Sequence, residues 1–312
     1  MARFVAIIGQ ACILALAAAC PGSGALGAPL PLRRIADGVY EFQGAIALMD
    51  RANHGAIANL GVVIGSKGCA VIDTGGSVRE GRDLLSAIRK ISSKPILYVI
   101  NTHVHPDHIF GNAAFLGLGA TFVGHANLPR TMAAQGPYYL KSFLPAMGHA
   151  LLADVRLVPP TLLVKNRLTL DLGGRKLALK TWAASHTDTD ITIEDEKTRV
   201  LFAGDLLFVE HIPVIDNSLD GFILDTKRLQ KQDARLVVPG HGPIPGDWHQ
   251  AVAAERHYFD VLKADITASL HKGLTMRATV HDAGASEAGS WKLFNDYNKR
   301  NATTAYAELE WN

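Results

Sequence analysis

Apolar residues occur along this chain in short runs and alternations that predict β-strands, separated by turns and by segments with helical spacing. These runs predict strands at residues 38–42, 59–65, 69–73, 95–100, 120–124, 176–182, 199–203 and 235–240. The residues between the second and third runs, Ser66, Lys67 and Gly68, predict a hairpin turn. Over residues 78–91 apolar side chains recur at helical spacing, which predicts a helix.

The last third of the chain has helical periodicity. We expect one continuous helix over residues 248–270 and a second from residue 286 to about residue 309. Trp291, Phe294 and Tyr297 are spaced by three, which is more typical of a core face than of a binding face. We therefore predict a main domain at residues 28–275 and a C-terminal helical extension at residues 276–312 that packs on it.

Residues 135–150 are rich in Gly, Pro, Tyr and Phe and have no clear period. Such an insertion either shapes a pocket, with Tyr138, Tyr139, Phe143 and Met147 as walls, or forms a packed surface loop. The sequence does not decide between these two interpretations.

Residues 1–27 have the outline of a secretory signal peptide. Arg3 supplies a positive charge, residues 4–20 are almost wholly apolar, and small residues precede a predicted cleavage point after Gly27. The apolar run is short, so an uncleaved membrane anchor is a minor alternative, and a lipid-modified Cys20 is another. We expect a soluble periplasmic protein with no stable membrane insertion after signal cleavage.

Charge and cysteine content exclude some classes of function. The formal net charge is +2, without a run of five or more Lys or Arg, so the chain lacks the basic surface that nucleic-acid binding requires. After signal cleavage only Cys69 of the three cysteines would remain, so no intramolecular disulfide is expected. Cys69 opens an apolar strand, which favours a core residue over a reactive thiol, and no G-x-S-x-G nucleophile motif is present.

The stretch from Asn101 to His108 carries the chemistry. His103, His105, Asp107 and His108 fall within six residues, directly after the predicted strand at residues 95–100. Imidazole and carboxylate are the usual ligands of a zinc ion that keeps an open position for water, whereas closed structural sites mostly use thiolates. Burying four such groups without a cation would be costly, so this cluster indicates a catalytic metal site.

These four residues match the H-x-H-x-D-H signature at every ligand position, and the chain resembles the metallo-β-lactamase-fold hydrolases. The predicted hairpin, the Asp73-Thr74-Gly75 turn and the helix at residues 78–91 resemble the opening of the same fold. The resemblance implies an α/β fold, a four-layer αβ/βα sandwich. It also implies that Asp73 supports the site loop from behind rather than binding metal.

The same resemblance identifies three further ligands, each after an apolar run and in family order: His186, Asp205 and His241. It implies two zinc ions per chain, with iron or manganese as alternatives. One ion would be held by His103, His105 and His186, the other by Asp107, His108 and His241, with Asp205 bridging them. Ser185 departs from the glycine that is common before the third element, which changes no ligand.

A dinuclear zinc site implies a hydrolase. Metal coordination lowers the pKa of water from 15.7 to roughly 7, so a metal-bridging hydroxide would attack an ester, thioester, lactam or related bond of a small-molecule substrate. The cations would also stabilise the charge that develops on attack. We assign Asp107 a catalytic role as well as a ligand role. Because true lactamases of the family lack the bridging aspartate, Asp205 makes zinc-dependent β-lactamase activity, promiscuous or not, an alternative to the main expectation.

Within the family, the chain is most similar to the exported quinoprotein relay system zinc metallohydrolases. The matching stretches are residues 204–213, 218–221, 294–301 and 305–311. This similarity implies a link to periplasmic quinoprotein dehydrogenases. Two alternatives stay open: a mononuclear iron oxygenase similar to persulfide dioxygenases, and a non-catalytic partner of a quinoprotein dehydrogenase.

Three other histidines are weaker candidates. His54 lies in a connection that forms a flap over the substrate in many family members, but a solvated loop residue is the simpler expectation. His125 is expected to be structural. His211, six residues after Asp205, is expected to be in a solvated loop or to support the site rather than to line the pocket.

Overall fold

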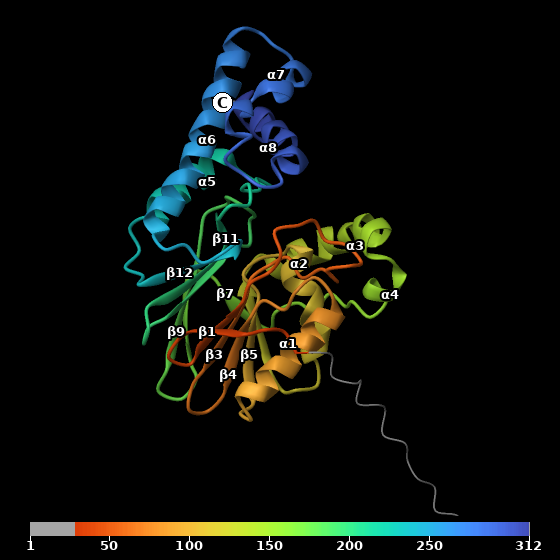
Figure 1. Cartoon of the computed structure of the whole chain (residues 1–312), viewed down its shortest axis with the longest axis vertical. Coiled ribbons are helices and arrows are strands. Elements are labelled where there is room, and N and C mark those ends of the chain that lie inside the picture. Colours follow the sequence, from red (N-terminus) through yellow and green to blue (C-terminus); the bar gives the residue numbers. More distant parts are fainter. Residues whose placement is uncertain (1–28, 312) are drawn as a thin grey trace, which may run out of the picture.

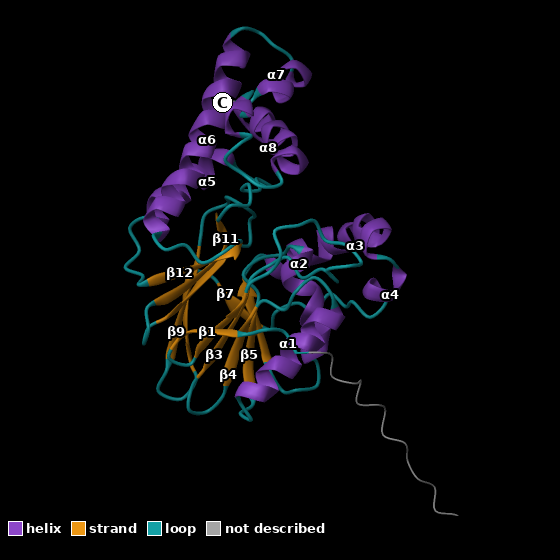
Figure 2. Ribbon diagram, viewed as in Figure 1, coloured by secondary structure: helices purple, strands orange, loops and turns teal. Residues whose placement is uncertain are grey.

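The computed structural model describes residues 29–311, so the predicted signal peptide at residues 1–27 lies outside the described residues. Two β-sheets lie face to face within this range (Figure 2). The first sheet contains, in spatial order, β1 (Arg33–Ala36), β2 (Val39–Phe42), β3 (Leu60–Ile64), β4 (Cys69–Ile72), β5 (Ile96–Ile100), β6 (Thr121–His125) and β7 (Leu162–Val164). The second contains β12 (Leu236–His241), β11 (Val200–Phe208), β10 (Ile191–Asp195), β9 (Lys176–Thr181) and β8 (Arg167–Asp171).

Helices pack against both sheets. The first sheet carries α1 (Val78–Ile91), whose buried residues Leu84 and Ile88 pack on β3–β5. The second sheet carries α5 (Leu219–Leu229), α6 (Trp248–His271) and α8 (Phe294–Leu309), which share one apolar core with β11 and β12. Apolar side chains of both sheets meet in a central core between them. Two packed sheets with flanking helices confirm the predicted α/β fold.

The helices of the C-terminal third gather at one end of the two sheets (Figure 1). The predicted helix at residues 248–270 is confirmed as α6. The predicted helix from residue 286 is wrong at its start: a short 3₁₀ turn (Ala285–Glu287) and a loop precede α8, and α7 (Met276–Asp282) comes before them. Because α7 and α8 pack on each other and on α6, the extension is a helical cluster, and the domain boundary at residue 275 stays a prediction.

The segment at residues 135–150 is not irregular. It forms most of α3 (Leu128–Met147) and the start of α4 (His149–Leu152), although Pro137 and Pro145 lie inside α3. Each proline removes one helical hydrogen bond, but the buried residues Met132 and Met147 pack into a separate apolar core, and this packing outweighs the lost bonds.

Two other differences concern strands. The run predicted to end before Asp205 continues to Phe208, so Asp205 lies inside β11 rather than after it. The strands β1, β7, β8 and β10 were not predicted, because three of them are short or exposed and β10 lies between acidic residues that resemble turn signals. Among residues 29–311, no helix has the length and apolar character needed to cross a membrane.

Candidate metal centre

The H-x-H-x-D-H stretch begins in a bent loop after β5, which carries His103 and His105, and continues into α2 (Pro106–Ile109), which carries Asp107 and His108. Asn101 anchors the start of this loop: its backbone N–H donates to Val123 O, and its side chain exchanges two hydrogen bonds with Asn112, at 2.8 and 3.1 Å. Pro106 at the first turn of α2 fixes the backbone where the chain becomes helical. The loop is thereby held in place from both ends.

Three of the predicted ligands meet at one point. His105 Nδ1 lies 3.1 Å from His103 Nε2 and 2.8 Å from His186 Nε2. Asp205 Oδ2 lies 3.2 Å from His186 Nε2 and 3.7 Å from His103 Nε2. A tetrahedral zinc site with bonds of about 2.0–2.1 Å separates its ligand atoms by roughly 3.3 Å, so these distances suit one cation. We call these three histidines the first group.

The other three predicted ligands form the second group: Asp107, His108 and His241. Asp107 Oδ2 lies 3.2 Å from His241 Nε2 and 3.7 Å from His108 Nε2. Asp205 reaches this group as well, with Oδ1 at 3.2 Å from His108 Nε2 and Oδ2 at 3.4 Å from His241 Nε2. The structure thus brings all seven predicted site residues together as two sets of convergent donor atoms, with Asp205 between them.

Two buried atoms at the centre test whether the site fits a cation. His108 Nε2 and Asp205 Oδ1 are buried and lie 3.2 Å apart, yet neither atom makes a hydrogen bond to the other or to any other described residue. Unpaired buried polar atoms are rare because their desolvation is costly. A divalent cation would satisfy both atoms, and imidazole and carboxylate are suitable donors for it. The residues therefore fit the metal ions that the sequence predicts, whose identity and number remain predictions.

In the second group, carboxylates and imidazoles lie next to each other and shift each other's pKa. Burial would raise the pKa of the Asp107 carboxyl, but the imidazoles of His108 and His241 lower it to about 2. Burial opposes protonation of His241, yet Asp205 and Asp107 raise its pKa to about 9. Because a metal ligand must be deprotonated, cation binding at this group would release protons.

A buried aspartate holds the second group from the first sheet. Asp73 Oδ2 accepts a hydrogen bond from His108 Nδ1 at 2.8 Å, and its carboxylate also accepts from the backbone N–H and the hydroxyl of Thr102. His241 Nδ1 donates to Ile57 O at 3.0 Å. Asp73 thus lies behind the site loop, where the family resemblance places it. It does so with a left-handed backbone, φ 56°, a strained conformation that a non-glycine residue adopts mainly where its surroundings require it.

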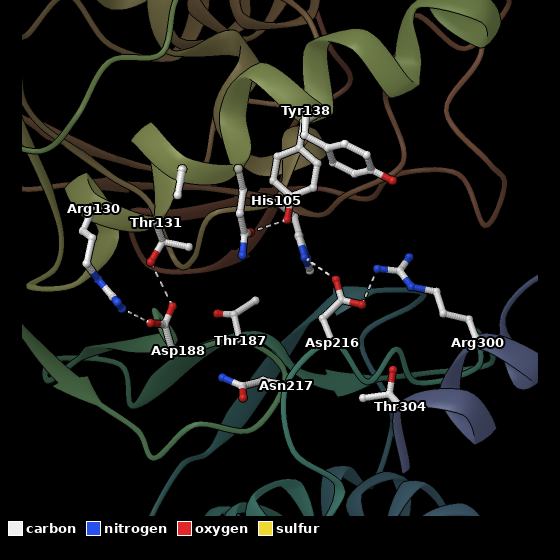
Figure 3. Close-up of a pocket in the computed structure, with 13 residues that line it drawn as sticks. His105, Arg130, Thr131, Tyr138, Thr187, Asp188, Asp216, Asn217, Arg300 and Thr304 are labelled. Carbon is white, nitrogen blue, oxygen red and sulfur yellow. Dashed lines mark hydrogen bonds and ion pairs between the residues drawn. The ribbon is translucent and has the colours of Figure 1, made fainter. Parts of the chain in front are cut away.

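The first group is held from a different side. His186 Nδ1 donates to Val214 O at 2.7 Å, and His105 Nε2 donates to Asp216 Oδ2 at 2.7 Å. Arg300 on α8 donates to the other oxygen of Asp216, as Figure 3 shows. In each case one ring nitrogen is bound by an acceptor and the other faces the centre, which fixes the tautomer and orientation of the ring.

Two adjoining cavities open at the site. The cavity over the two groups has a volume of about 270 Å³, and its walls beyond the predicted ligands are mainly apolar, including Met49, Ile57, Phe143 and Val214. The second cavity, about 640 Å³, is lined by polar residues of α3, α8 and the intervening loops (Figure 3). His105, Tyr139, Asp216 and Arg300 line both cavities and lie at their boundary.

The walls answer the question that the sequence left open about residues 135–150. Tyr139 and Phe143 line the apolar cavity, Tyr138 lines only the polar one and is largely exposed, and Met147 is buried in the core. This part of α3 is therefore both a pocket wall and a packed element.

The weaker histidine candidates fall into three environments. His54 lines a separate cavity with Arg51 and Arg79, away from the seven residues. His125 accepts a hydrogen bond from the backbone of Asn127, a structural contact. His211 is not solvated: it is buried, lines the apolar cavity, and has its pKa lowered by burial to about 4, so it is neutral at pH 7.

Ser185 replaces the common glycine without disturbing the turn. Its hydroxyl donates to Asp190 at 3.3 Å, and the Asp190 carboxylate also accepts from the backbone and hydroxyl of Thr187. Burial raises the pKa of Asp190 to about 6. The turn that presents His186 is thus organised around Asp190, a residue outside the sequence motifs that predict the site.

Asp216 and Arg300 were also missed as site residues. Neither has a local motif of metal chemistry, and they lie 84 positions apart. The signal that pointed nearest to them was the similarity of residues 294–301 to one subgroup of the family, because Arg300 lies in that stretch.

Comparison with known proteins gives a family and an enzyme to which parts of this chain are similar. Residues 55–241 match the family model described as the metallo-beta-lactamase superfamily. The chain is 50% identical over 50 residues to a linear primary-alkylsulfatase of Pseudomonas sp. (strain ATCC 19151), a match that covers 16% of this chain and 10% of that enzyme.

Solved structures show the same fold at low sequence identity. A metallo-beta-lactamase family protein from Thermus thermophilus is 21% identical, with a TM-score of 0.66, over 89% of this chain and 94% of its own. A stereoselective inverting sec-alkylsulfatase from Pseudomonas sp. is 16% identical, with a TM-score of 0.65, over 89% of this chain and 50% of its own. The chain thus spans about half the length of that sulfatase.

Proposed function

Because the matched family model covers more than half of its length, the chain belongs to the metallo-β-lactamase superfamily, and we propose that it is a dinuclear zinc hydrolase. The subgroup that supplies the finer proposal is the quinoprotein relay system zinc metallohydrolases. The substrate would be a small molecule with an ester, thioester, lactam or related bond.

The observation that carries the proposal is the position of Asp205. Its two oxygens lie within 3.4 Å of His186, His108 and His241, so one carboxylate contacts both groups of donor atoms. A carboxylate shared in this way suits two cations a few ångströms apart better than it suits one. Structural support for a second cation also comes from the unpaired His108 Nε2 and Asp205 Oδ1.

The chain's own residues would divide the work as follows. Bound zinc ions would supply Lewis acidity and a lowered pKa for water. His103, His105 and His186 would hold one ion, and Asp107, His108 and His241 the other. The carboxylate of Asp107, which lines the apolar cavity, would orient the attacking water. The apolar walls would exclude bulk water and seat the acyl part of the substrate.

The test compares wild type with Asp205→Asn. We expect two equivalents of zinc in the wild type and turnover of ester or thioester probes, and in the variant a loss of zinc with activity reduced about a thousandfold, equivalent to roughly 4 kcal/mol. Elemental analysis and kinetics on phenyl acetate, a benzoyl thioester and nitrocefin measure both. Asp260→Asn, at a half-exposed carboxylate on α6, is the matched control. Full zinc and full activity in Asp205→Asn would refute the bridging role.

A second candidate reaction is the hydrolysis of sulfate esters. It is favoured by the 50% identity over 50 residues to a primary-alkylsulfatase and by the fold shared with a sec-alkylsulfatase. Adding hexyl sulfate and dodecyl sulfate to the probes distinguishes this reaction from acyl hydrolysis. Iron in the purified protein with oxygen uptake on glutathione persulfide would instead support the oxygenase alternative.

Export and partnership extend the proposal. The charge and hydropathy of residues 1–27 support secretion to the periplasm, and the similarity of the tail supports a link to quinoprotein dehydrogenases. Cell fractionation with N-terminal sequencing of the mature chain tests the first. Binding to a purified quinoprotein dehydrogenase tests the second, and a partner that binds Asp107→Ala unchanged while no probe is turned over would favour a non-catalytic role.

A further inference from the structure

A short segment between β11 and α5 holds His105 and His186, two of the three histidines of the first group. Val214 O accepts from His186 Nδ1, and Asp216 Oδ2 accepts from His105 Nε2, both at 2.7 Å. The backbone N–H of Asp216 also donates to His186 O at 3.3 Å. Residues 213–216, which we call the bracing segment, thus set the orientation of two of the three imidazoles.

The bracing segment is itself held by α8. Asn301 is fully buried, and its side-chain oxygen accepts from the backbone N–H of Ile215 at 2.9 Å, while its amide nitrogen donates to Pro213 O at 2.6 Å. The same amide donates to Tyr258 on α6 at 3.0 Å. A single side chain therefore ties the backbone of the bracing segment to two helices.

Arg300, the neighbour of Asn301, acts on the carboxylate. Its guanidinium donates to Asp216 Oδ1 while Asp216 Oδ2 holds His105, so the three side chains form a row from α8 to the metal centre (Figure 3). Just before the segment, the backbones of Ile212 and Glu210 pair with Lys292, which precedes α8. Lys292 in the loop before α8, and Arg300 and Asn301 in α8, therefore contact residues 210–216.

We propose that Arg300 and Asn301 are positioning residues, through which α8 holds His105 and His186 in the geometry that binds metal. The physical basis is that groups contacting the outer nitrogen of a ligating imidazole fix its orientation, and their loss typically weakens metal binding 10–100-fold. Asp73 and Ile57 give the second group separate support, so the effect is confined to the first group. The inference rests on the metal-binding part of the proposed function and not on the reaction catalysed.

The test uses the full mature chain and the variants Arg300→Met and Arg300→Lys. The Arg300 side chain is half exposed, so its replacement leaves the fold intact. Zinc titration against a chromophoric chelator gives two binding constants, and anomalous diffraction at the zinc edge identifies the group that has lost metal. Arg256→Met, which removes another Arg–Asp pair of the same helical cluster, is the control.

We expect Arg300→Met to weaken zinc binding at the first group 10–100-fold. Arg300→Lys should keep part of this affinity, because lysine can still donate to Asp216. The melting temperature of the metal-free protein should not change. Asn301→Leu should show the same asymmetry between the groups, with some loss of stability. The proposal is overturned if zinc binding weakens equally at both groups, or if Arg300→Met and Asn301→Leu both bind zinc as the wild type does. Absence of zinc binding in the wild type would instead refute the proposed function, so the two failures are distinguishable.

Discussion

The two halves of the metal centre differ in where their support comes from. The second group is held by Asp73 and by Ile57 O, which lie within the segment matched by the family model. Two histidines of the first group, His105 and His186, are held through Asp216 and Val214, and these are in turn braced by residues of α8, far beyond that segment. The family fold therefore supplies the support of one half, whereas the other half depends on helices that follow it in the chain.

The two supports also differ in kind. Asp73 is a buried carboxylate in a strained backbone conformation, and it accepts three hydrogen bonds. The support of the first group is a row of side chains, ending in a half-exposed arginine. We therefore expect the second group to be insensitive to changes in α8 and the first group to respond to them.

The largest expected effect is a loss of overall stability, caused by a substitution that does not touch the support of either group. Arg175 is buried, pairs with Asp195 at 2.8 Å, and donates to Ile64 O in β3 and to Asp37 O in the turn between β1 and β2. Arg175→Met leaves Asp195 buried without its partner, which should cost about 3–5 kcal/mol in the free energy of unfolding, measured by urea denaturation. The ratio of the two zinc affinities should not change, and a changed ratio would mean that the halves are not independently supported.

The pH dependence of the same pair has a definite sign. Hydrogen bonds and charge from Arg175 and Thr198 outweigh burial and lower the pKa of Asp195. A lowered pKa in the folded state stabilises the protein above the unfolded pKa of about 3.9, and this contribution is lost as the pH falls through the folded value. The stability difference between wild type and Arg175→Met should therefore shrink as the pH falls below about 3.9.

The next effect should reach both halves together. A Cβ on Gly240 would lie 1.9 Å from Asp205 Oδ1, so Gly240→Ala must displace the carboxylate that both groups share. We expect weaker zinc binding at both groups and a stability loss of about 1–3 kcal/mol, measured by chelator competition and thermal melting. Gly246→Ala, where a Cβ meets no atom within 4 Å, is the control. Loss of metal from one group alone would contradict the bridging position of Asp205.

The smallest effect should fall mainly on the second group, because Asp73 contacts His108 directly and reaches His103 only through the hydroxyl of Thr102. Asn tolerates the left-handed backbone of Asp73, so Asp73→Asn keeps the turn while replacing an acceptor with a donor toward His108 or Thr102. Zinc binding at the second group should weaken roughly tenfold or more, with the first group less affected. Asp37→Asn, at an exposed surface carboxylate, is the control. A larger loss of zinc affinity at the first group than at the second would contradict the assignment of Asp73 to the support of the second group.

Most of the site was predictable because its chemistry is local. Six of the seven predicted residues follow or end a strand that the apolar runs identified, and Asp205 differs only in lying inside β11. The order of these elements along the chain was the basis for predicting a metal centre. The structure brings all seven side chains together. The segment at residues 135–150 was harder, because its prolines argue locally against the helix that tertiary packing stabilises.

What the sequence determined by itself was the set of donor atoms and the strands that end beside them, since ligand type and strand periodicity are properties of neighbouring residues. Apart from Asp73, only the tertiary structure decided which side chains support those donors. Asp216, Arg300 and Asn301 reach the site because α8 packs on α6 and on the loop after β11, and such contacts between distant segments leave no local pattern in the chain.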